Sequence, residues 1–119
     1  MKRLMMAVAM TLMVAGNSHA GLRVLGSGST LRFDPSGFPP DMQAKYEIMR
    51  AKCVKCHTLE RTVIAITTGI SPISGQPFDH DAIKAYGVKM MRKPGSGMSR
   101  QQVVETVELM NYLLSSASK

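Results

Sequence analysis

The sequence predicts a small all-α domain that follows an export signal. Apolar residues recur at helical spacing in three separate segments, and the later two begin with recognisable capping residues. No segment shows a strong alternation of polar and apolar residues, the pattern of a half-buried strand. A length of 119 residues suits one domain. Hydrophobic residues make up 45% and charged residues 19%, a composition that argues against a wholly disordered chain.

Residues 1–20 have the three parts of a secretory signal peptide. Lys2 and Arg3 precede twelve residues that are apolar with one exception, and the segment ends with small residues at Ser18 and Ala20. The apolar stretch is shorter than the roughly 20 residues that a membrane-spanning helix needs. We therefore expect cleavage after Ala20, export to the periplasm, and no membrane span in the mature chain.

Residues 21–40 are rich in Gly, Ser and Pro, and we expect an extended or flexible N-terminal tail there. Leu31, Phe33 and Phe38 are the side chains through which this tail would contact the domain. Asp41 then offers an N-cap for a first helix. The apolar face of that helix comprises Met42, Tyr46, Met49, Cys53 and Cys56.

The segment from Leu59 to Pro77 contains β-branched residues interrupted by Gly and Pro, which predicts a long loop with a helical start at most. Asp79 is the predicted N-cap of a second helix, with Phe78 and Ile83 as a hydrophobic staple across the cap. The face of this helix presents Ile83, Tyr86, Gly87 and Met90, and Pro94 ends it.

A third helix follows the capping-box pair Ser99 and Gln102. Its predicted buried stripe consists of Val103, Val107, Met110 and Leu114.

The chemistry of the chain is concentrated in Cys53-Val54-Lys55-Cys56-His57, a C-x-x-C-H motif typical of c-type haem attachment. Two thiols about one helical turn apart can add to the two vinyl groups at one haem edge, and the next imidazole can then reach the iron. A ligating histidine commonly donates its other ring N–H to a carbonyl. Pro72 is the candidate for that carbonyl.

Three other interpretations of the two cysteines are weaker. A disulfide across two residues would close too small a loop to stabilise the fold much. A thioredoxin-like redox pair is expected to open a helix in a βαβ unit, whereas a helix precedes this motif. A zinc site built from Cys53, Cys56, His57 and His80 has an unusual spacing.

From Asp41 onward the sequence resembles the class I single-haem c-type cytochromes. The resemblance lies in a helix that leads into C-x-x-C-H, a loop, a methionine-bearing segment from Met90 to Ser96, and a final helix with the run Asn111 to Leu114. It implies that residues 41–119 form an all-α domain of three main helices packed around one covalently attached haem c. A long loop would connect the first and second helices.

The resemblance also implies which residues bind the cofactor. Cys53 and Cys56 would carry the thioether links and His57 would be the proximal iron ligand. Small bacterial members often place the distal methionine four residues before a Pro-x-Ser stretch, which favours Met90, with Met91 as the alternative. Met98 and His80 remain further candidates for the distal ligand. Arg61 is a candidate for contact with a haem propionate.

The implied function is electron transfer between redox proteins, without enzymatic catalysis. A haem-based sensor, a peroxidase with a labile distal ligand, and a thiol-disulfide oxidoreductase remain as alternatives. Lys and Arg number 15 against 8 Asp and Glu, scattered rather than gathered with aromatic residues, so nucleic-acid binding is not expected. Six basic residues near the expected haem edge favour acidic docking surfaces on the partners: Lys52, Lys55, Lys84, Lys89, Arg92 and Lys93.

Overall fold

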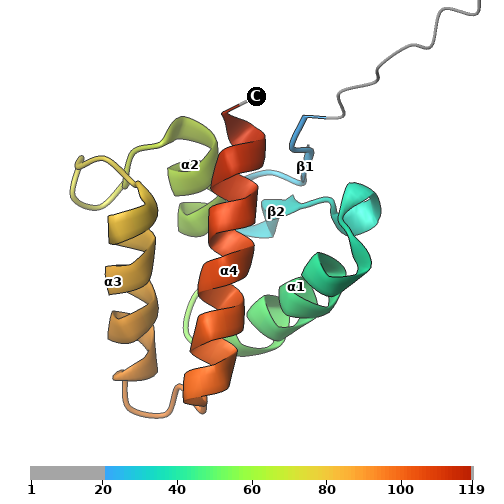
Figure 1. The fold of residues 1–119 in the computed structure, drawn as a ribbon. Helices are drawn as coiled ribbons and strands as arrows, with labels where there is room; N and C mark the ends of the chain where they lie inside the picture. The colour runs from blue at the N-terminus through green and yellow to red at the C-terminus, as the bar shows by residue number, and fades with distance from the viewer. Residues whose placement is uncertain (1–20, 119) are drawn as a thin grey trace, which may run out of the picture.

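The structure, a computed structural model, describes residues 21–118 and is mostly helical (Figure 1). The predicted signal peptide and its cleavage site after Ala20 lie outside the described residues. The described elements are β1 (Val24–Leu25), η1 (Gly28–Thr30), β2 (Arg32–Phe33), η2 (Pro35–Gly37), α1 (Pro40–Cys53), α2 (Glu60–Thr68), α3 (His80–Met91) and α4 (Arg100–Ala117).

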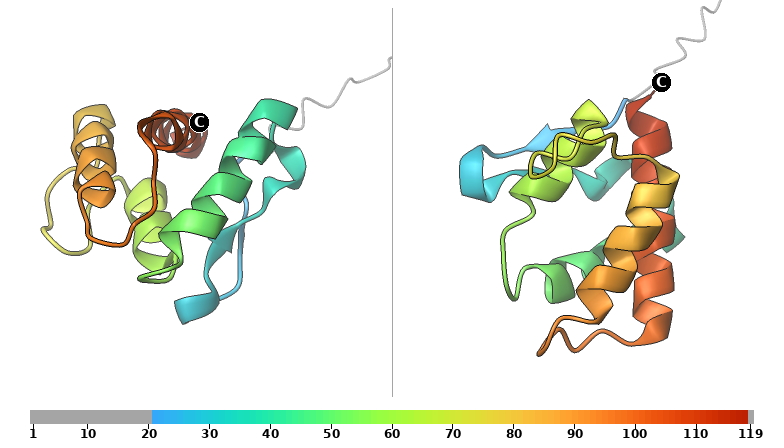
Figure 2. Two further views of the ribbon diagram at one scale, coloured as in Figure 1. Left: turned by 90° about the horizontal axis from the view of Figure 1, so that it is seen from below. Right: turned by 90° about the vertical axis from the view of Figure 1, so that its left-hand side faces the viewer.

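Helix α4 is the centre of the packing and contacts each of the other three helices. Viewed along its axis, it lies between α3 on one side and α1 on the other (Figure 2). Leu109, Met110 and Leu113 on α4 are fully buried. Among residues 21–118 no helix combines the length and the apolar character that crossing a bilayer requires.

Helix α1 begins two residues earlier than predicted, at Pro40 after the N-cap residue Pro39 instead of Asp41. Proline suits the first helical turn because its missing N–H has no partner to lose there. Asp41 lies in that first turn, where its carboxylate faces the positive end of the helix dipole. The helix ends at Cys53, so it leads into the cysteine motif as predicted.

Helix α2 occupies the segment that was predicted to be mainly loop. It buries Thr62, Val63, Ala65 and Ile66 and ends at Gly69, whose φ of 72° lies in the left-handed region. β-branched residues have modest helix propensity, but tertiary packing of an apolar face outweighs it. The fold therefore has four helices in its described part instead of three, and the long loop shortens to residues 69–79.

The predicted caps of the last two helices are confirmed. The Asp79 carboxylate accepts a hydrogen bond from the Ala82 N–H at 2.9 Å. The Ser99 hydroxyl accepts from the Gln102 N–H at 3.1 Å, and the Gln102 side chain accepts from the Ser99 N–H at 3.0 Å. These bonds satisfy backbone donors that would otherwise be unpaired at the helix starts.

Helices α3 and α4 approach closely at Gly87. A Cβ atom placed on Gly87 would lie 2.6 Å from Cγ2 of Val107, so the contact depends on the missing side chain. On the other side of α4, Lys45 of α1 pairs with Glu108 at 2.8 Å between Nζ and Oε2. The predicted stripe of α4 is partly shifted, because Leu109 and Leu113 are buried more deeply than Val107 and Leu114.

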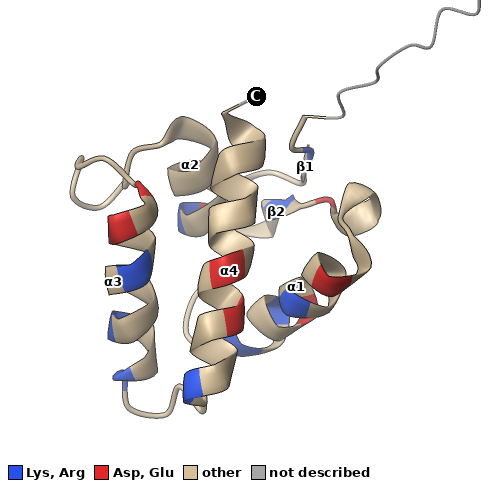
Figure 3. Cartoon of the chain, viewed as in Figure 1, with Lys and Arg blue, Asp and Glu red and all other residues tan. Residues whose placement is uncertain are grey.

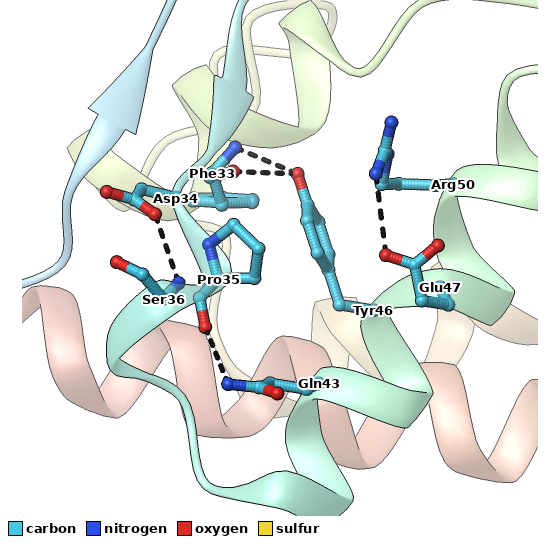
Figure 4. A network of polar contacts seen from close by, with 8 residues as sticks. All are labelled: Phe33, Asp34, Pro35, Ser36, Gln43, Tyr46, Glu47 and Arg50. Atoms are coloured by element: carbon cyan, nitrogen blue, oxygen red, sulfur yellow. Dashed lines mark hydrogen bonds and ion pairs between the residues drawn. The ribbon is translucent and has the colours of Figure 1, made fainter.

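Residues 21–40 are folded, in contrast to the predicted tail. Strands β1 and β2 pair antiparallel with Val24 opposite Phe33, and the Phe33 side chain is fully buried in the core. The Tyr46 hydroxyl, on α1, donates to the Phe33 carbonyl and accepts from the Phe33 N–H, each at 3.0 Å (Figure 4). The turn residues of this segment thus form the corners of a compact hairpin.

Candidate functional site

The cysteine motif lies at the junction between α1 and α2. Cys53 is the last residue of α1 and is partly buried against the core, whereas Cys56 is exposed in the following turn. Burial raises the pKa of the Cys53 thiol from 9.0 to about 11. Both cysteines are free thiols.

His57 follows the second cysteine and has a carbonyl partner close by. Its Nδ1 lies 2.8 Å from the carbonyl oxygen of Thr58. Because a carbonyl oxygen only accepts, Nδ1 carries a proton, and in the neutral imidazole the lone pair is then on Nε2. This is the tautomer that a metal-ligating histidine needs. The partner is Thr58 instead of Pro72, since the next residue in the turn already places a carbonyl within reach.

A cavity of about 350 Å³ opens beside His57 and is lined by residues that lie far apart in the sequence. Its volume falls within the roughly 300–1,000 Å³ that is usual for cofactor and small-molecule sites. The cavity brings together four of the predicted site residues: His57, Arg61, Pro72 and Met90. Further lining residues come from α2, the loop before α3, α3 itself and the turn after it, namely Thr62, Ala65, Ser71, Ile73, Ser74, Phe78, Tyr86, Lys89 and Lys93.

The cavity distinguishes among the four candidate distal ligands. Met90 lines it, one helical turn after Tyr86 on the same face of α3. Met91 and Met98 are not among its lining residues. His80 is exposed at the start of α3, and its Nδ1 lies 2.6 Å from Oδ1 of Asn111 on α4. Of the four, Met90 alone shares the cavity with His57.

Tyr86 and Phe78 form an aromatic part of the cavity wall. The Tyr86 ring packs edge-to-face on Phe78, with the ring centroids 6.1 Å apart. Burial raises the Tyr86 pKa, a hydrogen bond with the Thr62 side chain lowers it, and the nearby Cys53 thiol raises it further. The two cysteines do not line the cavity themselves, and Cys53 and Tyr86 both pack against the hydrophobic core.

The charged residues of the cavity are all basic. Arg61, Lys89 and Lys93 are exposed, and no Asp or Glu stands among the lining residues. Such a lining suits a ligand whose body is apolar and whose edge carries carboxylates.

These residues fit a c-type haem in three respects. An imidazole and a thioether are a known axial pair for haem iron, and both line one cavity. The apolar lining residues could cover the macrocycle, and the basic ones could pair with its propionates. Two thiols stand directly before the imidazole in sequence. In residues 21–118 no group of three or more His, Cys, Asp or Glu side chains is placed to hold a metal ion.

Comparison of the chain with protein-family models, with curated proteins and with solved structures gives no significant match.

Two features of this site were not predicted from the sequence. The role of the Thr58 carbonyl as partner of His57 cannot be recognised in a sequence, because any residue can supply a backbone acceptor. Thr62 and Ala65 were placed in a loop, and their contribution to the wall depends on α2 being helical. The apolar residues Leu59, Val63 and Ile66, at positions i, i+4 and i+7, have the helical spacing that could have indicated this helix.

Proposed function

We propose that the mature protein is a single-electron carrier with one haem covalently attached through Cys53 and Cys56. The observation that supports this proposal most is the cavity that His57 and Met90 share, with His57 directly after the second cysteine in sequence. When bound, haem c supplies a one-electron ferric/ferrous couple.

In this proposal the residues of the chain hold and shield the cofactor. His57 would hold the iron through Nε2, while the Thr58 carbonyl accepts the Nδ1–H and so fixes the ring. The Met90 thioether would be the second protein ligand and would favour the reduced state. Phe78 and Tyr86 exclude water from the cavity. Arg61 is placed at the cavity to pair with a propionate.

The environment of the cysteines argues against the thiol-disulfide oxidoreductase. Reactive cysteines have a lowered pKa, often because they stand at the positive N-terminal end of a helix. Cys53 stands at the C-terminal end of α1, and its thiol pKa is raised by burial. A thiol in this environment is a poor nucleophile, whereas thiol-disulfide exchange requires a good one. Once both sulfurs are thioethers to haem, in contrast, the mature protein needs no thiolate.

Basic residues along α3, coloured blue in Figure 3, indicate where a redox partner would dock in this proposal. A surface groove beside the cavity has Ala85 and Val88 as its apolar floor. Lys89 and Lys93 line both this groove and the cavity. Acidic partners would thus be steered toward the haem edge, and the rate of electron transfer would fall with ionic strength. The remaining charged residues of the groove are Asp81, Lys84 and Arg92.

Replacement of single methionines tests the proposal. We expect Met90→Ala to lose the far-red absorption band that arises from methionine bound to ferric haem iron, and to bind carbon monoxide when reduced. Met91→Ala is the matched control, because Met91 is the neighbouring residue outside the cavity, and it should keep the band.

Two outcomes would contradict the proposal in this form. If Met90→Ala retains the band, Met90 is not the distal ligand. If the unmodified protein binds carbon monoxide without denaturant, the iron has an open position, and the sensor or peroxidase function is favoured over electron transfer.

A further inference from the structure

A second concave site lies on the hairpin side of His57, apart from the cavity. It is a groove of about 560 Å³ between the hairpin, the second half of α1 and the turn before α2. His57 lines both the groove and the cavity, and it is the one residue that they share. The groove is lined by Ser29, Thr30, Leu31, Arg32, Glu47, Arg50, Ala51, Val54, His57, Thr58 and Leu59.

Two arginines supply the positive charge of this groove. Arg32 is exposed, its Nη1 donates to the Thr30 carbonyl at 3.3 Å, and no carboxylate within residues 21–118 forms an ion pair with it. Arg50 pairs with Glu47 at 3.4 Å, and both side chains are more than half exposed (Figure 4). Such an exposed pair is weak, so Arg50 can exchange this partner for a better one.

The two arginines belong to different elements and line the same groove. Arg32 lies in β2 and Arg50 in α1. Burial raises the pKa of the Tyr46 hydroxyl, the hydrogen bond with the Phe33 backbone lowers it, and the positive charges of Arg50 and Arg32 lower it further. Hydroxyl groups add neutral donors, because Ser29 and Thr58 line the groove and their side chains have no hydrogen-bond partner in the described part of the chain.

We propose that this groove binds a small oxyanion, either a phosphate or a carboxylate, between Arg32 and Arg50. Guanidinium groups match such anions because their N–H donors form a planar fork. Glu47 would be displaced from Arg50 as the anion enters. The bound anion would lie beside His57 without entering the cavity, so the binding does not depend on the proposed haem.

Titration of the secreted mature protein tests this inference, with sodium phosphate and sodium citrate as separate probes at constant ionic strength. Amide NMR signals report the position of binding. We expect saturable shifts confined to the residues around the groove, in the ranges 28–32, 47–54 and 57–59. Saturation by phosphate alone or by citrate alone would each support the site and would identify the class of anion.

Three variants make the test specific. Arg32→Gln and Arg50→Gln should each weaken binding about fivefold or more, because each removes a charge-assisted hydrogen bond. Glu47→Gln should strengthen it, because the competing carboxylate is lost. Arg100→Gln, an equal loss of charge at an exposed arginine outside the groove, should change it less than about twofold.

The inference is overturned if no signal saturates, or if Arg100→Gln weakens binding as much as Arg32→Gln, which would indicate non-specific attraction to a basic protein. A protein that binds the anion but carries no haem would refute the proposed function and leave this inference standing.

Discussion

The Tyr46 hydroxyl shows how one polar atom can anchor a segment. It satisfies both backbone groups of Phe33, and the ring contacts Phe33 and Phe38 edge-to-face at centroid distances of 6.3 and 5.7 Å. Without the hydroxyl, a buried N–H and a buried C=O would lose their partner. A buried unpaired group costs more than a hydrogen bond gains.

We therefore expect Tyr46→Phe to lower the free energy of unfolding by about 1–3 kcal/mol, measured by urea denaturation. Tyr112→Phe is the control, because the Tyr112 hydroxyl has no hydrogen-bond partner in residues 21–118 although its ring packs on Phe38. Equal stability of Tyr46→Phe and the unmodified protein would show that the hairpin is not held by this hydroxyl.

The buried Cys53 thiol predicts a dependence of stability on pH. Its pKa is raised to about 11 in the fold, so the neutral thiol is the form that the fold favours. The corresponding stability is present below pH 9 and is lost as the pH rises from 9 toward 11. In the chain with free thiols the loss should reach about 2 kcal/mol.

Denaturation of haem-free protein between pH 8 and pH 11 checks this. The decline should be smaller in Cys53→Ala and unchanged in Cys56→Ala, because Cys56 is exposed. A thioether at Cys53 cannot lose a proton, so protein with attached haem should resemble Cys53→Ala. Identical profiles for the unmodified chain and Cys53→Ala would contradict the burial of this thiol.

Among the elements, the contact between α3 and α4 depends most clearly on one residue. A β-branched side chain cannot move its methyl group far, so a Cβ at position 87 and Cγ2 of Val107 cannot both keep their places. Alanine in place of glycine normally stabilises a helix by about 1 kcal/mol. Here the steric conflict should outweigh that gain.

Gly87→Ala should accordingly lower the free energy of unfolding by about 1–3 kcal/mol. Gly87→Ala should cost less in a protein that already carries Val107→Ala than in the unmodified protein, because the smaller side chain at position 107 makes room for the added Cβ. Thermal or denaturant unfolding of the four proteins gives the coupling energy. Additive effects would contradict the close approach.

The elements that sequence predicted correctly are those marked by local chemistry. Asp79 and Ser99 cap their helices because their short side chains accept a hydrogen bond from a backbone N–H of the first turn that has no partner within the helix. The hairpin was missed because its residues favour loops, and a contact with a distant residue, that of Tyr46 with Phe33, decides its structure. Helix α2 was predicted only as a helical start of a loop, because its β-branched residues have modest helix propensity and tertiary packing stabilises it.

At the scale of the whole molecule, the cavity was only partly predictable. The motif from Cys53 to His57 indicated the chemistry, and the face that carries Tyr86 and Met90 indicated which side of α3 is buried. The meeting of His57 with Met90 in one cavity depends on how α2, α3 and the 69–79 loop pack. No local pattern contains that information.

The central claim is the covalent attachment of one haem, and intact mass spectrometry of the secreted protein tests it most directly. The protein should be produced in a host that matures c-type cytochromes. We expect the mass of residues 21–119 plus one haem, retained after acid-acetone extraction, and loss of this retention when Cys53 and Cys56 are both changed to Ala. A mass equal to that of the polypeptide alone would contradict it.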